Sequence, residues 1–280
     1  MIKKLMDNYK ILIAIPVIIT LIMLAVVAIQ GLDQGIELQG GTIASIKLNE
    51  PSSSSAVTEK LTDIGVKEIK ILNNNGNDLT VQFGSGFDSS KFKNEVSSMG
   101  TVVNYYEVSP VLSQEAMDQV VWAILFAFIF MAITVFIIFR ELVPALGVIL
   151  AAGCDIIIAI GGMSIFHVPL SIASVGAILM LIGYSVDTDI LLTTRLFKRK
   201  EGTMEYRAQE AMKTGITMSI AAIVSMVVLY LVTMIYIPEA TTLSDIAAVL
   251  ILGLLADIIT TWFMNLGILR MYLGKGKKNK

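Results

Sequence analysis

The segment "LSIASVGAILMLIGYSVDTDILLTTR" (Leu170–Arg195) decides the fold class, because it is apolar enough to cross a membrane and yet carries two carboxylates near one end. A bilayer core requires about 20 mostly apolar residues in a helix. A charged side chain near the middle of such a helix costs about 3 kcal/mol on insertion scales, and the charges that are kept usually pair, relay protons or line an ion path. Asp187 and Asp189 are therefore candidate functional residues.

The composition of the whole chain also indicates a membrane protein. Of its 280 residues, 55% are hydrophobic and 16% are charged, and the mean hydropathy is +0.75. The net charge of −2 indicates no general attraction to nucleic acid. One histidine and one cysteine exclude a histidine-based metal cluster and an internal disulfide. The sequence contains no phosphate-binding loop, nucleophile–base set or nucleotide motif, so we expect no enzymatic activity, no cofactor and no metal.

Six apolar runs are long enough to span a bilayer. Lys and Arg gather in the amino-terminal tail, after the second and fourth runs and in the carboxy-terminal tail, whereas the short loops around His167 and Pro238 contain none. The positive-inside rule therefore predicts two cytoplasmic termini and an external segment between the first two runs. The runs are Ile11–Ile29, Val120–Phe139, Ala145–Phe166, Leu170–Thr193, Gly215–Ile237 and Ile246–Ile268.

The segment between the first two runs is polar and predicts a separate α+β domain. Alternating residues in "GTIASIKL" predict a strand over Gly41–Leu48, and the runs 68–72, 79–83 and 101–108 predict three more. Helices are expected near Ser55–Asp63 and from a cap at Asp88 to about Met99. The order βαββαβ is typical of a ferredoxin-like domain, for which binding is expected rather than catalysis. A further helix near Leu112–Gln119 runs into the second span.

These predictions divide the chain into four parts. A cytoplasmic tail and the first span occupy residues 1–30, and the external ferredoxin-like domain with its helical lead occupies 31–119. A bundle of five spans follows over 120–270, and a basic cytoplasmic tail over 271–280. The fold class is a polytopic α-helical membrane protein with six spans and one external domain.

Four carboxylates lie within the predicted spans. Asp155 and Asp257 fall near the middle of the membrane, and Asp187 and Asp189 fall in its inner half. Residues two apart are separated by about 200° on a helix, so Asp187 and Asp189 cannot both face one interior seam. One could face a cavity of the bundle, and the other a neighbouring subunit, the cytoplasmic interface or Arg195.

The acids have structural and functional interpretations. Burial favours the neutral form of a carboxylic acid, which suits a proton carrier. A helix-packing hydrogen bond or a structural salt bridge is the alternative, above all for Asp257. Lys213 is either a counter-charge for these acids or an anchor at the cytoplasmic surface.

Several motifs together resemble SecF proteins of the SecD/SecF family. "GIELQGGT" (Gly35–Thr42) is similar to the family's "GIDFxGGT", and "VSP" at Val108–Pro110 to its "VGP". "GYSVDTD" (Gly183–Asp189) is similar to the fourth-span "GYSxND". The order of one span, an external domain and five spans also resembles the family plan over essentially the whole chain. The motif residues are Gly35, Glu37, Gly40, Gly41, Gly183, Tyr184 and Ser185.

The resemblance implies a protein-export role in the plasma membrane. SecF pairs with SecD as two pseudo-symmetric halves of a transporter of the resistance–nodulation–division (RND) superfamily, and the pair assists the SecY translocon in moving preproteins, coupled to proton or ion flow. Membrane lipids would surround it. The order Asp187-Thr188-Asp189 departs from the Asn-Asp order of bacterial members and fits an archaeal type. Lys213 stands where bacterial members tend to have Arg. The expected relay set is Asp155, Asp187, Asp189, Asp257 and Lys213.

Two other functions are compatible with the same sequence. The chain could be half of a small-molecule or lipid exporter of the RND superfamily, although such proteins have larger external regions. It could also be a non-transporting scaffold that stabilises the translocon.

Overall fold

The computed structural model describes residues 8–63, 65–66, 69–84, 89–198, 201–237 and 240–276. The chain divides into two compact units. One unit comprises Gln34–Val121 and holds the sheet. The other comprises Met1–Asp33 and Trp122–Lys280 and holds the long helices. The predicted cap at Asp88 and the ends of the chain, residues 1–7 and 277–280, lie outside the described residues.

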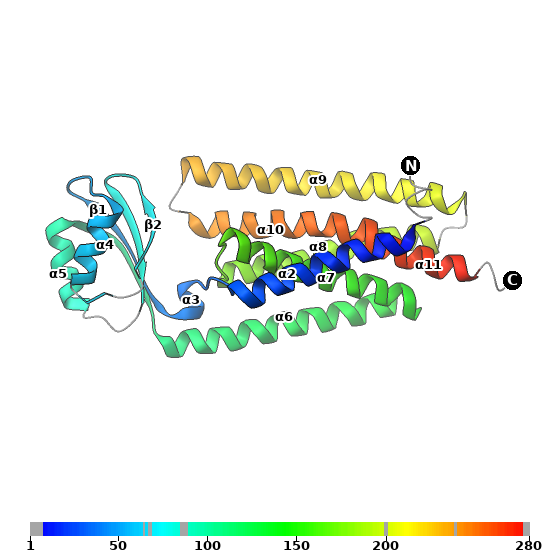
Figure 1. The fold of residues 1–280 in the computed structure, drawn as a ribbon, viewed down its shortest axis with the longest axis horizontal. Helices are drawn as coiled ribbons and strands as arrows, with labels where there is room; N and C mark the ends of the chain where they lie inside the picture. Colours follow the sequence, from blue (N-terminus) through cyan, green and yellow to red (C-terminus); the bar gives the residue numbers. More distant parts are fainter. Residues whose placement is uncertain are drawn as a thin grey trace. The chain divides into compact units, whose positions relative to one another are not determined.

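The sheet unit has the predicted βαββαβ order (Figure 1). Its four strands are antiparallel and lie in the order β2-β3-β1-β4. The first strand has the predicted bounds, and the second begins at Lys70. The predicted start of the second strand, residue 68, lies outside the described residues. The elements are α3 (Ile36–Gln39), β1 (Gly41–Leu48), α4 (Ser54–Asp63), β2 (Lys70–Asn74), β3 (Asp78–Phe83), α5 (Ser89–Met99) and β4 (Gly100–Val108).

The core of the sheet unit lies between one face of the sheet and the two helices α4 and α5. Successive side chains of a strand point to opposite faces, and the alternate residues Ala44, Ile46 and Leu48 of β1 are buried. They form one cluster with residues of β3 and of both helices, including Val57 and Phe92. The alternation that predicted this strand thus corresponds to one face that packs in the core.

The helical unit contains six helices or helix runs that are long and apolar enough to cross a membrane, and each overlaps one of the predicted spans. The fourth begins two residues later than predicted, at Ile172, and the fifth ends one residue earlier, at Tyr236. The sixth run is continuous but includes a π-helical segment, η1. The helix predicted near Leu112–Gln119 is the beginning of a longer helix, α6. The elements are α2 (Tyr9–Gln30), α6 (Pro110–Phe139), α7 (Leu142–Phe166), α8 (Ile172–Phe197), α9 (Met204–Tyr236), α10 (Thr241–Ile259), η1 (Thr260–Asn265) and α11 (Leu266–Gly276).

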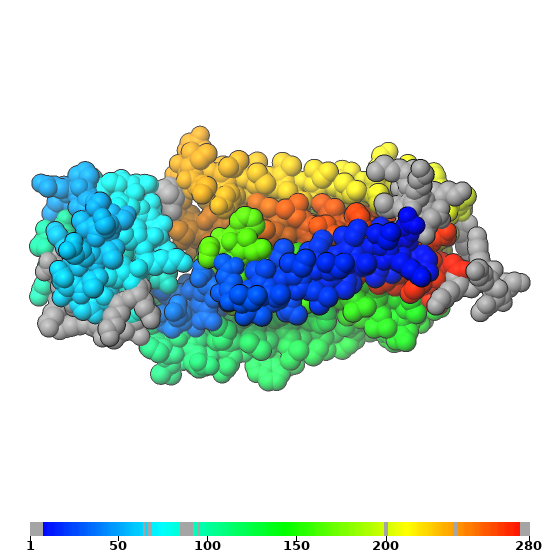
Figure 2. All heavy atoms as spheres, viewed as in Figure 1, coloured from blue at the N-terminus to red at the C-terminus, as the bar shows by residue number. Residues whose placement is uncertain are grey.

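Three helices form the centre of the helical unit, and three lie outside it. About half of the apolar stretch is buried in α7, in α8 and in the run from α10 to α11, whereas α2, α6 and α9 bury little of theirs. Figure 2 shows α2, in blue, at the surface of this unit. Exposed apolar side chains along α6 and α9 are suited to contact with lipid.

Small residues allow the central helices to approach one another closely. A Cβ atom on Gly253 of α10 would lie 2.3 Å from Leu181 of α8. A Cβ atom on Gly161 of α7 would lie 2.5 Å from Met23 of α2. Small residues at such contacts are characteristic of helix packing in membranes.

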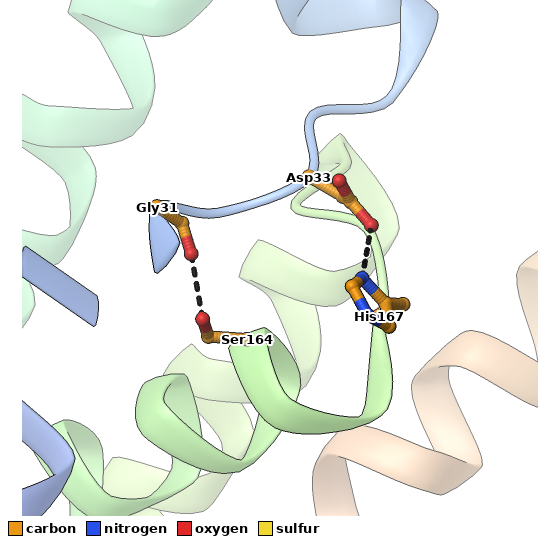
Figure 3. A network of polar contacts seen from close by, with 4 residues as sticks. All are labelled: Gly31, Asp33, Ser164 and His167. Carbon is orange, nitrogen blue, oxygen red and sulfur yellow. Dashed lines mark hydrogen bonds and ion pairs between the residues drawn. The ribbon is translucent and has the colours of Figure 1, made fainter. Parts of the chain in front are cut away.

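A network of polar contacts connects the end of α2 to the turn between α7 and α8 (Figure 3). The Ser164 hydroxyl donates to the Gly31 carbonyl at 2.6 Å. The Nδ1 atom of His167 lies 3.1 Å from Oδ2 of Asp33, and the backbone N–H of Leu170 donates to the Asp33 carbonyl at 2.7 Å. The single histidine thus lies in this network, where its left-handed backbone (φ 54°) ends α7.

Candidate functional site

Three of the four predicted acids lie in the centre of the helical unit. Asp155 on α7, Asp189 on α8 and Asp257 on α10 are completely buried. Asp187, two residues before Asp189, is exposed on the opposite side of α8, as the helical angle between them requires. The structure therefore separates the two acids of the "DTD" motif into an inner and an outer residue.

Asp155 accepts hydrogen bonds from two other helices. The Ser185 hydroxyl on α8 donates to its Oδ2 atom, and the Thr260 hydroxyl on η1 donates to its Oδ1 atom. Each carboxylate oxygen therefore has one hydroxyl donor. Because Ser185 belongs to the "GYS" motif, this contact gives a structural reason for that residue.

Asp257 is held by threonine hydroxyls. Thr188, which lies between the two acids of α8, donates to its Oδ2 atom at 3.1 Å. Thr261, one helical turn after Asp257, donates to its Oδ1 atom at 3.0 Å. The structural interpretation considered for this acid, a hydrogen bond between packed helices, is thus present in the structure.

Asp189 contacts an amide side chain that the sequence analysis did not single out. The Nδ2 group of Asn265 donates to Oδ1 of Asp189 at 2.7 Å and lies 3.4 Å from the Thr193 hydroxyl. The Oδ2 atom of Asp189 and the Oδ1 atom of Asn265 are buried and have no hydrogen-bond partner among the described residues. Two acceptor oxygens are thus left unpaired in one pair of side chains.

The π-helical segment η1 supplies three of the side chains that contact these acids. Thr260, Thr261 and Asn265 all lie within it and are completely buried. π-Helical turns are rare and often occur at functional sites. The sequence did carry one signal, since Asp257, Thr261 and Asn265 are each four residues apart and so share a helix face.

The buried acids have no basic partner in the part of the chain that the structure describes. Every Lys and Arg with a described burial is exposed or only partly buried. No group of three His, Cys, Asp or Glu side chains among the described residues could hold a metal ion. Because an unpaired buried charge is costly, this cluster differs from a site in which each acid is held by a salt bridge.

Lys213 does not lie with the buried acids. It is exposed on α9. Among the residues that the structure describes, no hydrogen bond or ion pair joins its ammonium group to any of the four acids. This position corresponds to the alternative in which Lys213 anchors the helix at a membrane surface.

The glycine-rich motif belongs to the sheet unit and shapes a turn. Gly35 precedes α3, Glu37 lies in the first turn of that helix, and Gly40 and Gly41 connect it to β1. Both of these glycines have a positive φ, of 80° and 132°. A Cβ atom on Gly41 would lie 2.6 Å from the Phe83 carbonyl oxygen. The motif is therefore needed for the backbone path into the sheet.

Of the three residues that begin the second motif on α8, one contacts the acid cluster. Ser185 is buried against Asp155, and Tyr184 is half-buried. Gly183 is exposed, and a Cβ atom there would meet nothing within 4 Å. Its small size is therefore not explained by any contact within the described part of the chain.

Comparison with known proteins gives one family. The sequence profile described as "Protein export membrane protein SecD/SecF, C-terminal" matches residues 89–275. A protein-export membrane protein SecF from Methanothermobacter thermautotrophicus is 57% identical over 98% of this chain and 96% of its own length. The SecF protein from Methanocaldococcus jannaschii is 39% identical over 98% of this chain and 99% of its own length.

Solved structures share the fold. The crystal structure of SecDF from Thermus thermophilus matches with a TM-score of 0.80 and 18% identity, covering 98% of this chain. The present chain spans only 38% of that protein. A heavy metal efflux pump matches with a TM-score of 0.52 and 15% identity, covering 71% of this chain and 21% of the pump. At these identities, both matches concern the fold alone.

Proposed function

This chain belongs to the SecD/SecF family of protein-export membrane proteins, and we propose that it is the SecF-like half of a complex with a SecD-like subunit. The complex assists the SecY translocon in moving preproteins across the plasma membrane. The supporting observation is the high identity to archaeal SecF proteins over nearly the whole chain. The function is transport rather than enzymatic catalysis, and it requires no cofactor and no nucleic acid.

The orientation follows from the distribution of basic residues. Both termini lie in the cytoplasm, and the sheet unit lies outside as a ferredoxin-like domain at about residues 31–119. The strand order β2-β3-β1-β4 supports this name for the domain. The domain handles the emerging preprotein, and the helical unit, surrounded by lipid, supplies the coupling to proton or ion flow.

The buried acids support this coupling. Asp155, Asp189 and Asp257 lie in a core with hydroxyl and amide donors and no described buried Lys or Arg. A purely structural site would not need three carboxylates, because their burial is costly and neutral side chains make equivalent hydrogen bonds. Uptake and release of a proton or another cation is the use that compensates for this cost. Asp189 is the acid of the "DTD" motif to which we assign this role.

Asp187 has a different role, in binding the partner subunit. Ile172, Met180 and Gly183 are also exposed. Their spacing along α8 places them on the same face of the helix as Asp187. A carboxylate facing lipid costs about 3 kcal/mol. A membrane helix of the SecD-like subunit against this face removes that cost and also accounts for the open space above Gly183.

The test separates the two acids of α8. Export of a secreted reporter is measured in cells whose own protein is replaced by Asp187→Asn, Asp189→Asn or the double variant. Co-purification of the SecD-like subunit is measured in parallel. We expect Asp189→Asn to lose export and retain assembly, and Asp187→Asn to weaken assembly. The exposed Asp118→Asn on α6 is the matched control, and we expect it to change neither.

The alternative functions predict other outcomes. A non-transporting scaffold predicts normal export in the Asp189→Asn cells as long as the complex assembles. Normal export in the double variant would rule out cycling of charge at α8. An exporter of small molecules would leave the reporter unaffected in all variants and in cells that lack the chain.

A further inference from the structure

The short segment that follows α2, residues 31–33, is fastened to the turn between α7 and α8 (Figure 3). We propose that this segment is a strap through which rearrangement at the buried acid Asp155 reaches the chain that leads into the sheet unit, with Ser164 as its positioning residue. The inference deepens the proposed function and rests on it for its use in export. The coupling through the strap is a property of this chain and is measured without export.

Three polar contacts hold the strap. The Ser164 hydroxyl donates to the Gly31 carbonyl at 2.6 Å, and the backbone N–H of Leu170 donates to the Asp33 carbonyl at 2.7 Å. The Nδ1 atom of His167 lies 3.1 Å from Oδ2 of Asp33. The strap is thus bonded at both of its ends, so it moves with the turn unless these bonds break.

The turn to which the strap is fastened is itself fixed at both ends. His167 ends α7, and its backbone N–H donates to the Met163 carbonyl. A capping box begins α8: the backbone N–H of Ser174 donates to the Ser171 hydroxyl at 3.1 Å, and the backbone N–H of Ser171 donates to the Ser174 hydroxyl at 2.7 Å. Such caps satisfy the backbone groups that a helix end leaves unpaired. A displacement of α7 or α8 therefore carries the turn with it.

Packed side chains connect the strap to the buried acids. Leu32 of the strap and Leu170 of the turn pack against a buried apolar cluster that includes Leu181 of α8. Leu181 lies about one helical turn before Ser185, and the Ser185 hydroxyl donates to Asp155 of α7. Energetic coupling between separate sites is carried by contiguous packing and hydrogen bonds of this kind, and a coupling measurement is what demonstrates it.

Ser164 contributes more to the strap than the exposed ion pair does. The side chains of His167 and Asp33 are 65% and 38% exposed, and ion pairs in contact with water contribute little. The Ser164 side chain is buried, and a hydrogen bond shielded from water is stronger than an exposed one. Alanine at this position removes the hydroxyl and keeps the helix, so Ser164→Ala is the substitution that loosens the strap.

The test measures amide hydrogen exchange of residues 31–34 in the purified full-length protein, together with its SecD-like subunit where the two co-purify. Asp155→Asn puts an NH₂ group in place of one of the two oxygens that accept from Ser185 and Thr260, so it disturbs the contact of α7 with α8 or with η1. We expect this variant to speed exchange in residues 31–34 by about 5-fold, the lower end of ordinary coupling between sites.

The response should depend on the strap. In the Ser164→Ala background we expect Asp155→Asn to change the exchange of these residues by less than about 2-fold, because the route is already broken. Ser164→Thr keeps the hydroxyl and should retain the response. Ser225→Ala on α9 is the matched control, because its hydroxyl donates to Ala221 of the same helix, and it should retain the response as well. Exchange at the start of α10, residues 241–244, is the reference for general loosening.

Three outcomes would overturn the proposal. They are unchanged exchange of residues 31–34 in Asp155→Asn, an equal rise at the start of α10, and a full response that persists in Ser164→Ala. If Asp155→Asn does not fold, Ser185→Ala takes its place, since it removes one donor to the same acid. A negative result here leaves the export test of the α8 acids unchanged, and normal export in that test leaves this coupling unchanged, so the two failures are distinguishable.

Discussion

The hydrogen bond from Thr260 to Asp155 allows a sharp test of the buried cluster. We expect Thr260→Val to destabilise the helical unit, because valine keeps the shape of threonine and removes the hydroxyl that donates to Oδ1 of Asp155. The acid would then keep only the Ser185 hydroxyl. Both acid and threonine are completely buried, so water does not replace the lost donor.

The size of the effect follows from two measured ranges. A hydrogen bond to a charged group contributes about 1.5–3 kcal/mol in soluble proteins. Side-chain hydrogen bonds inside membranes average about 0.6 kcal/mol and reach about 1.7 kcal/mol. For a buried carboxylate with one donor per oxygen we expect about 1–2 kcal/mol, which changes the unfolding equilibrium about 5- to 30-fold.

Reversible unfolding of the full-length protein in mixed micelles measures this loss. Thr260→Ser is the matched control, because it keeps the hydroxyl and loses one methyl group, at a cost of about 0.8 kcal/mol. The free energy of unfolding of the double variant with Ser185→Ala should fall by more than the sum of the two single losses. The excess should be more than about 0.5 kcal/mol, because both hydroxyls donate to one acid. A valine variant no less stable than the serine variant would refute the role of this hydrogen bond.

Three further substitutions test the packing of the chain. Gly215→Ala should destabilise the helical unit by about 1–3 kcal/mol, because its Cβ atom would lie 2.3 Å from the ring of Trp262; an unchanged unfolding midpoint would contradict this. Gly41→Ala should unfold the sheet unit, since its φ is 132° and its Cβ atom would lie 2.6 Å from the Phe83 carbonyl oxygen; a native circular dichroism spectrum of the sheet would argue against it. Ser164→Ala removes the hydrogen bond to the Gly31 carbonyl at the end of α2. We expect faster amide exchange in the residues that follow Gly31, and Ser164→Thr, which keeps the hydroxyl, is the control.

The sheet unit shows where sequence patterns suffice and where pairing overrides them. Alternation predicted β1 with its observed bounds, because one face of that strand is buried. The second strand was predicted to end before the asparagines of "NNNGND". The structure continues it through Asn73 and Asn74, which pair with Thr80 and Leu79 of β3. Asparagine is a poor strand former, but pairing across the hairpin compensates for that preference.

The acid cluster could be predicted only in part. Charge inside an apolar span identified all four acids, and the helical angle separated Asp187 from Asp189. Which of the two faces inward depends on the neighbours of α8, and those are fixed by packing between distant segments. Asn265 was missed although it lies on one face with Asp257. Polar uncharged residues are common enough in membrane helices that this spacing alone is a weak signal.

The π-turn of η1 also determines what the last span can contact along its length. An i→i+5 turn holds one residue more than an α-helical turn, so the helix that follows is rotated by about 100°. Before and within the turn, Asp257 and Asn265 face the polar centre. Beyond it, Leu266 and Leu269 pack with the beginning of α9, in the same cluster as Trp262. A single added residue thus lets one continuous helix serve two different neighbours, and removing it would put every later side chain out of phase with the apolar surface it now meets.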